Sequence, residues 1–211
     1  MMRKYILMDI DGTLVNTKEQ FYTSLGETLS HFGIEAEMTP ELFGMSVNQA
    51  LQALQVTNIA EAKEFWETRF AELCEQAPFF PGIPEAVEDL CRDGRQLIVI
   101  TSRSHCTADP MCLYSPLAPY ICCCIAAEDT PRHKPNPDPI LKALALYNID
   151  PKDTIYIGDG YHDYMASRAA GVAFGFAGWN EDAVCHEEYA NVFSTPADLK
   201  RLEAEEGIVH A

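Results

Sequence analysis

Four short apolar runs, each ending at a polar or turn-forming residue, constrain the fold of this chain more than any other feature of its sequence. Such runs are typical of parallel strands that helices cover on both faces, because neither face of the strand meets water. The four predicted strands span residues 5–8, 97–100, 121–126 and 154–157. Residues 172–176 predict a fifth strand, and residues 191–193 predict a sixth.

Helical patterns separate these runs. Residues 85–92 carry an apolar face, and Gly94 is well placed to end that helix. Asn136, followed by a proline, predicts the start of a second helix, and residues 162–170 predict a third. The alternation of strands and helices predicts an α/β fold, with a Rossmann-like parallel sheet and helices on both of its faces.

Residues 16–79 break this alternation because they show helical periodicity only. One stretch places Val47, Ala50, Leu51 and Leu54 at the spacing i, i+3, i+4, i+7. We therefore predict an all-helical cap domain at 16–79, inserted into an α/β core formed by residues 1–15 and 80–211.

The composition of the chain limits the binding partners and the cellular compartment that we expect for it. Among 211 residues, 32 acidic side chains against 15 basic ones give a formal charge of −17, which disfavours nucleic acid and anionic membranes as partners. The first apolar run is too short for a signal peptide, and no run reaches the length of a membrane helix. We expect a cytoplasmic protein, monomeric or homodimeric, with a frayed end at residues 203–211.

The eight cysteines agree with a reducing compartment, because no Cys-x-x-Cys pair or other metal-binding spacing occurs. Three of them, Cys122, Cys123 and Cys124, fall in an apolar run that predicts a buried strand. There we expect them to pack as small apolar side chains.

Chemically reactive residues follow the predicted strands, at the sheet edge where open α/β folds bind ligands. Four segments lie there: residues 9–14 (Asp-Ile-Asp-Gly-Thr-Leu), Thr101 with Ser102, residues 134–137 (Lys-Pro-Asn-Pro), and residues 158–163 (Gly-Asp-Gly-Tyr-His-Asp).

Carboxylates from Asp9, Asp11 and Asp159 would repel one another at this edge unless a cation joined them. An oxygen-only ligand set favours Mg²⁺, which commonly binds one or two carboxylates together with substrate phosphate oxygens. Thr101 adds a hydroxyl and Lys134 an ammonium group at the same edge. These are the parts that phosphoryl transfer needs: a nucleophile, an acid/base, a metal and a positive clamp.

The set of motifs resembles that of the haloacid dehalogenase-like superfamily, specifically its phosphoglycolate-phosphatase-like branch with a helical cap after the first motif. Residues 9–14 match the first motif, Thr101 the second, Lys134 the third, and residues 158–159 with Asp163 the fourth. The resemblance extends over nearly the whole chain.

The resemblance implies a role for each matching residue. Asp9 would be the nucleophile and a magnesium ligand, and Asp11 the general acid/base that also offers its backbone carbonyl to the metal. Asp159 would be a metal ligand, and Asp163 would support the metal directly or through water. Thr101 and Lys134 would hold the phosphoryl oxygens. For contact with the substrate we select Gly12, Thr13, Ser102 and Arg103, although a surface salt bridge is an equal alternative for Arg103.

Two departures from the family pattern stand out. Many relatives carry aspartate where this chain has Asn16, which bears on how the cap hinges. Residues 104–119 correspond to a regular helix in the family, yet here they contain Pro110, Pro116 and Pro119. Because proline breaks a helix interior, we expect a shortened helix or an irregular loop.

The predicted function is a magnesium-dependent phosphatase that hydrolyses a small phosphorylated metabolite through an aspartyl-phosphate intermediate. A phosphomutase of the same fold and a non-catalytic phosphate-binding module are the alternatives. The sequence does not distinguish phosphoglycolate, sugar phosphates, nucleotides and pyrophosphate as substrates.

Overall fold

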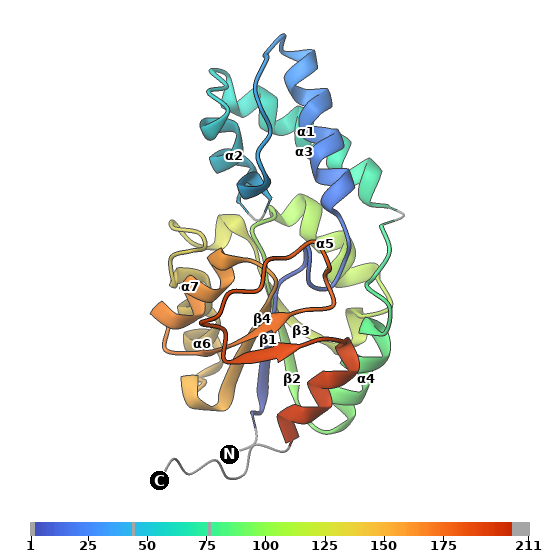
Figure 1. Ribbon diagram of the computed structural model, residues 1–211, viewed down its shortest axis with the longest axis vertical. Helices are drawn as coiled ribbons and strands as arrows, with labels where there is room; N and C mark the ends of the chain where they lie inside the picture. Colours follow the sequence, from blue (N-terminus) through green and yellow to red (C-terminus); the bar gives the residue numbers. More distant parts are fainter. Residues whose placement is uncertain (1–2, 44, 76, 204–211) are drawn as a thin grey trace.

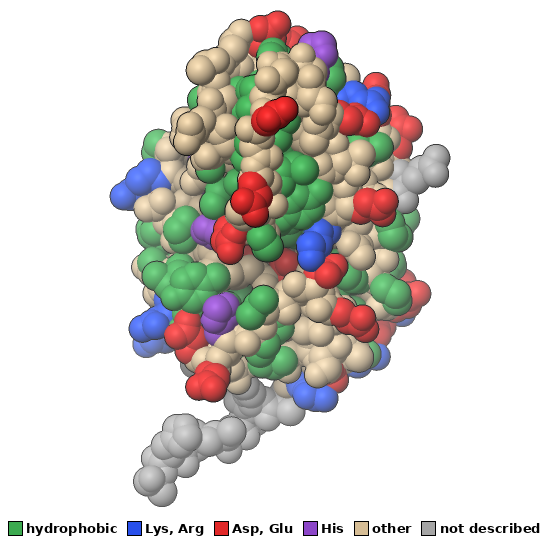
Figure 2. Space-filling model, turned by 45° about the horizontal axis from the view of Figure 1, so that its top comes forward, with side chains coloured by type: hydrophobic (Ala, Val, Ile, Leu, Met, Phe, Trp, Pro, Cys, Tyr) green, Lys and Arg blue, Asp and Glu red, His purple; other side chains and the backbone are tan. Residues whose placement is uncertain are grey.

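The computed structural model describes residues 3–43, 45–75 and 77–203 (Figure 1). The expectation of a frayed end at 203–211 falls almost entirely outside these ranges. Along the described chain, we find no helix with the length and apolar character that crossing a membrane requires. Acidic side chains are spread over the face in Figure 2, in keeping with the net charge.

A six-stranded sheet forms the centre of the molecule. Its strands are β1 (Tyr5–Met8), β2 (Gln96–Ile100), β3 (Ile121–Ile125), β4 (Thr154–Gly158), β5 (Ala173–Ala177) and β6 (Asn191–Phe193). They lie in the order β3-β2-β1-β4-β5-β6, and every neighbouring pair is parallel. The predicted fold class is confirmed.

Successive residues of the central strands face opposite sides of the sheet and build two separate cores. Ile6 and Met8 of β1 pack in one cluster, while Leu7 packs in the other. The first cluster includes residues of α4 (Ile83–Arg92), α5 (His105–Tyr114) and the 3₁₀ helix η5 (Pro196–Glu203). The second includes residues of α6 (Asp138–Tyr147) and α7 (Tyr161–Ala169). Figure 1 shows the two helical layers on either side of the sheet.

Strand β3 corrects the prediction of a buried strand. It lies at the edge of the sheet, and its Cys122 side chain is exposed. Cys123 and Cys124 are half-buried, and each packs against one of the two cores. An edge strand has a neighbour on one side only, so less of it is covered. The apolar run predicted the strand correctly, but it did not reveal the strand's position in the sheet.

The proline-containing segment forms a ten-residue helix, α5, with Pro110 in its interior. This agrees with the expected shortened helix and excludes an irregular loop. Pro110 is exposed, so a backbone carbonyl that it leaves without an intrahelical partner can hydrogen-bond to water. Pro116 and Pro119 follow the helix end, and Pro119 lies in a 3₁₀ turn (Ala118–Tyr120).

Three helices form a group of their own, which we call the cap: α1 (Lys18–His31), α2 (Val47–Ala53) and α3 (Ile59–Cys74). They share a hydrophobic core with no member from the sheet. Ser46 begins α2 with a capping box, in which its side chain and that of Gln49 each accept a backbone N–H. Figure 1 shows the cap at one end of the core, with the sheet below it.

The two chain segments that join the cap to the core pair with each other. The Asn16 N–H donates to the Pro78 carbonyl (3.1 Å), and the Phe80 N–H donates to the Leu14 carbonyl (3.1 Å). Val15 and Phe79 form an antiparallel bridge between these bonds. We call this pairing the hinge. It lies close to both predicted domain boundaries, and the boundaries themselves stay a prediction.

Candidate active site

The strand order places the candidate site at the centre of one sheet edge. From β1 the chain proceeds to β2 and β3 on one side, and then crosses to β4 on the other side. Ligands of open α/β sheets bind at such a reversal, outside the carboxyl ends of the strands. Asp9 directly follows β1, Thr101 follows β2, and Asp159 follows β4.

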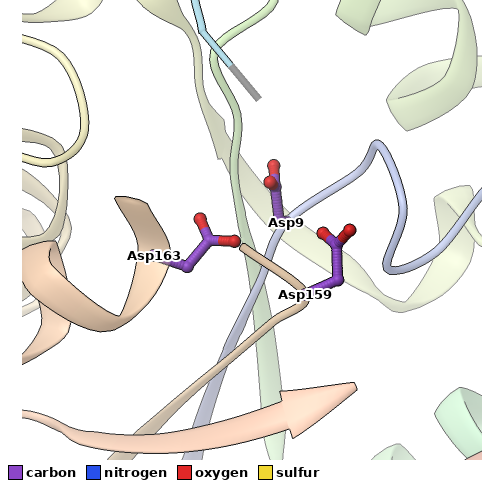
Figure 3. Close-up of side chains that lie close together, drawn as sticks. All are labelled: Asp9, Asp159 and Asp163. Carbon is purple, nitrogen blue, oxygen red and sulfur yellow. The ribbon is translucent and has the colours of Figure 1, made fainter. Parts of the chain in front are cut away.

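Three carboxylates converge at this edge. Oxygen atoms of Asp9, Asp159 and Asp163 all lie within 4.8 Å of one another. Figure 3 shows the three side chains around a common space, with Asp163 coming from α7 and the other two from the strand ends. Asp11 is not a member of this group, because its side chain is bound elsewhere.

A buried lysine compensates two of these charges. The Lys134 Nζ lies 2.7 Å from Asp9 Oδ2 and 2.7 Å from Asp163 Oδ1, and it donates to the Tyr156 hydroxyl at 3.1 Å. Its side chain is 2% exposed. Although burial alone would lower the pKa of the Lys134 ammonium, the two carboxylates raise it above its usual value. The ammonium therefore stays charged, as a positive clamp requires.

The environment of Asp9 favours a bound cation. Burial raises the pKa of Asp9 to about 7, and the Lys134 charge opposes this shift. For Asp159, burial and the negative charges of Asp163 and Asp9 raise the pKa well above its usual value. A divalent cation among these oxygens would reverse both shifts by stabilising the ionised forms. The oxygen-only ligand set fits Mg²⁺.

Two glycines make room for the carboxylates. Gly12 has a φ of +75°, and a Cβ there would lie 2.1 Å from Asp159 Oδ2. A Cβ on Gly158 would lie 2.5 Å from Asp163 Oδ2. Only glycine satisfies both the backbone conformation and the close approach at position 12.

Two residues predicted to contact the substrate hold the turn after β1 and one of the carboxylates. The Gly12 N–H donates to the Val15 carbonyl (2.9 Å), closing the turn after β1. The Thr13 side chain is completely buried, and its hydroxyl donates to Asp159 Oδ1 (3.2 Å). Both residues therefore position the loop and the Asp159 carboxylate, and their contact with the substrate stays a prediction.

Arg103 forms a buried ion pair rather than the surface salt bridge considered from the sequence. It is 7% exposed, and its Nε and Nη2 donate to the two Asp11 oxygens at 2.8 and 2.6 Å. The Thr17 hydroxyl also donates to Asp11. Burial alone would raise the pKa of Asp11, but the Arg103 charge and these hydrogen bonds lower it overall. Asp11 is therefore held as a carboxylate in this arrangement.

The second predicted motif lies beside this pair. Thr101 is 4% exposed, and its Oγ1 accepts from the Arg103 N–H at 3.1 Å. Ser102 is half-buried and lines the space between the core and the cap. Arg103 itself reaches the cap, where its guanidinium lies 4.8 Å from the centre of the Phe70 ring.

The sequence analysis did not identify four residues that lie at the site. Tyr156 links Lys134 to Asp163, and Thr17 binds Asp11. Trp179 Nε1 donates to the Thr13 carbonyl (2.9 Å), and Asn180 Nδ2 donates to Asp159 Oδ2 (2.9 Å). The last two follow the end of β5 at the same sheet edge, so their position was a usable signal. Tyr156 lies inside an apolar strand run, where no feature of the sequence distinguishes it from a tyrosine of the hydrophobic core.

Comparison with known families supports this geometry. The family model described as haloacid dehalogenase-like hydrolase matches residues 6–177. The chain belongs to this family. The enzyme class predicted from the sequence, a phosphatase of this family, is confirmed.

The individual proteins that resemble this chain share less than a third of its residues. The pyrophosphatase PpaX of Bacillus mycoides is 26% identical over 181 residues, which cover 82% of this chain and 83% of that protein. A proposed phosphoglycolate phosphatase from Lactobacillus plantarum has a TM-score of 0.84 at 29% identity, covering 96% of this chain and 100% of that chain. CbbY of Rhodobacter sphaeroides, solved with phosphate, has a TM-score of 0.79 at 23% identity, with coverage of 94% and 96%. The last likeness shows the fold alone.

Replacing Gly12 with alanine should lower turnover as well as stability. We expect Gly12→Ala to displace Asp159 and to lower turnover by at least about a hundredfold, as misplaced catalytic groups do. The matched control is Gly94→Ala, because Gly94 has a φ of +84° but no neighbouring atom within 4 Å of an added Cβ. The control should lose roughly 1–2 kcal/mol of stability and keep its turnover. Equal turnover in both variants would contradict this account.

Removing the Lys134 charge should destabilise the fold. We expect Lys134→Met to lower the free energy of unfolding by about 3–5 kcal/mol, because two buried carboxylates lose their partner. Urea denaturation measures this loss. As a control, Lys142→Met removes a more exposed ion pair, with Asp129, and should cost at most about 1 kcal/mol. Similar losses in the two variants would show that Lys134 does not compensate the carboxylates.

Proposed function

We propose that the protein is a magnesium-dependent phosphatase that hydrolyses small phosphate monoesters through an aspartyl-phosphate formed on Asp9. The observation that carries this proposal is the group of Asp9, Asp159 and Asp163, with the buried Lys134 paired to the first and the last of them. It combines a nucleophilic carboxylate with metal ligands and a fixed positive charge, at the sheet edge where this fold binds ligands.

In the first step, an Asp9 carboxylate oxygen attacks the phosphorus atom, and the bond from phosphorus to the leaving oxygen breaks. Asp11, in its protonated form, donates a proton to that oxygen. Because the pairing with Arg103 favours the carboxylate form, Asp11 has to leave Arg103 before this proton transfer. A carboxylic acid near the leaving oxygen is the usual means of making an alkoxide depart as an alcohol.

In the second step, water attacks the phosphorus atom of the aspartyl-phosphate, and the Asp9 carboxylate is released. Asp11 in its carboxylate form accepts a proton from this water. The Arg103 pair supports this role, since it holds Asp11 ionised and fixes the orientation of both its oxygens. One residue thus serves as acid and then as base.

The metal would be held by Asp9, Asp159 and Asp163, with the backbone carbonyl of Asp11 as the predicted further ligand. When bound, Mg²⁺ neutralises charge on the phosphoryl oxygens. Lys134 supplies a second positive charge at the same place, and Thr101 a hydroxyl. The carboxylates and Lys134 are all anchored in β-strand ends, α7 or the loop before α6, which keeps the site rigid.

The cap regulates access to this site. The space between Asp9 and the cap is a cavity of about 30 Å³, which holds about two water molecules. A substrate therefore enters only when the cap moves away, and the hinge allows that motion while both connections stay paired. The Glu67 side chain of α3 accepts a hydrogen bond from the Ser104 hydroxyl, which helps to hold the cap closed.

The Asp9 carboxylate should be indispensable for turnover. We expect Asp9→Asn to lower phosphate release by at least about a thousandfold while the protein remains folded, because the amide is not a nucleophile. Phosphate release and circular dichroism measure the two properties. Asp93→Asn, a change at an exposed helix end, is the matched control and should keep full activity. Substantial activity in Asp9→Asn would remove the nucleophile from the proposal.

Turnover and stability should both depend on the metal ion. We expect EDTA to stop turnover and Mg²⁺ to restore it, and we expect Mg²⁺ to raise the melting temperature. At a hundredfold excess over its Kd, the ion should stabilise the fold by about 2.7 kcal/mol. Asp159→Asn should abolish this stabilisation, which is measured without any substrate. Turnover that persists in EDTA would contradict the metal site.

A further inference from the structure

The cavity between cap and core has two chemically different sides. Its floor is polar and belongs to the core, with Asp9, Asp11, Ser102, Arg103 and Ser104. Its roof belongs to the cap and consists of Phe21, Phe43, Met45, Val47, Trp66 and Phe70. We call this cavity the chamber. Once the cap has moved far enough to admit a substrate, a leaving group attached to a phosphoryl group on Asp9 would extend from the floor towards an entirely apolar roof.

The aromatic rings of the roof pack against one another. Trp66 stacks on Phe70 with a centroid distance of 4.5 Å, and Phe21 meets Trp66 edge to face at 5.8 Å. Phe43 meets Phe21 edge to face at 5.5 Å. These contacts fix a rigid apolar surface, since each ring is oriented by the next. Such a surface favours apolar or aromatic ligands by the area that it removes from water.

In the arrangement of the structure, the positive charge in the chamber is already paired. Among the described residues that line it, Arg103 is the single cation, and both Asp11 oxygens already accept its Nε and Nη2 groups. The third nitrogen, Nη1, donates to the Thr107 carbonyl at 3.0 Å. A carboxylate or second phosphate brought under the roof would lose its hydration, and it would have to compete with Asp11 for Arg103 to gain a counter-charge.

The nearest alternative for an anion lies outside the chamber. Lys63 lines a separate, more polar cleft between cap and core, together with Asn48 and His133. Its ammonium is 3.6 Å from Glu67. A substrate with two negative groups could reach this cleft only by extending sideways past Ser102 and Ser104, which line both spaces.

We propose, on the basis of the phosphatase function above, that the substrate is a phosphate monoester whose leaving group is uncharged, with an apolar or aromatic body. This class differs from pyrophosphate and phosphoglycolate, the substrates in the names of the related proteins, because both of those leaving groups are anionic.

The deciding experiment compares benzyl phosphate with 2-phosphoglycolate and pyrophosphate on the purified full chain with Mg²⁺. The first two both release a primary alcohol, so their intrinsic reactivities are similar and the leaving-group body is what differs. We expect kcat/KM for benzyl phosphate to exceed that for either anionic compound by at least about tenfold. An equal or higher value for an anionic compound would overturn the proposal and leave the phosphatase function standing.

A charge placed in the roof should change this preference. Met45→Lys introduces a cation of similar length at a half-buried position of the chamber. It should lower the ratio of kcat/KM for benzyl phosphate to kcat/KM for 2-phosphoglycolate by about tenfold. Asn48→Lys is the matched control, since it adds the same charge near α2 but in the polar cleft, and should leave the ratio unchanged. The opposite pattern would place the leaving group in the cleft and overturn the proposal.

Absence of any Asp9-dependent phosphate release, from every ester and from pyrophosphate, would instead overturn the phosphatase function and this proposal with it.

Discussion

The Lys134 ammonium is the interaction on which the rest of the site depends. It lies within 2.7 Å of carboxylates that come from two different elements, the end of β1 and the first turn of α7. Without a cation, three acidic groups in a buried space would protonate or move apart. One lysine on the loop before α6 thus lets the strand ends and a helix bring their acids together, and it leaves room for a divalent ion to complete the neutralisation.

Arg103 and Asp11 form a second buried ion pair, in which a cation again compensates a carboxylate. Here one cation is matched by one carboxylate, so the pair is neutral and adds no net charge to the chamber. Arg103 also lies against Phe70 of the cap. The residue that would move protons is therefore held by a side chain in contact with the cap. The neutral pair of Arg103 and Asp11 below an apolar roof is the basis of the proposed preference for an uncharged leaving group.

One error of the sequence analysis shows what a local pattern leaves out. Cys122 belongs to an apolar run, yet it is exposed because β3 has a neighbour on one side only. Gly12 and Thr13 follow the nucleophile, and the turn brings them to Val15 and Asp159, contacts that the sequence did not reveal. In each case the local pattern predicts the element correctly. What surrounds the element depends on residues far away in the sequence, and no local pattern contains them.

The sequence by itself determined the order of strands and helices along the chain, the helical insertion, the acids at the strand ends and the lysine before a helix, because periodicity and the position of an element's end are local properties. Only the tertiary structure decided that Asp163 joins Asp9 and Asp159 while Asp11 turns to Arg103. It also decided that Tyr156, Trp179 and Asn180 support the site. The physical reason is that ion pairing and burial depend on distances across the sheet, between residues as far apart as 168 positions in the chain.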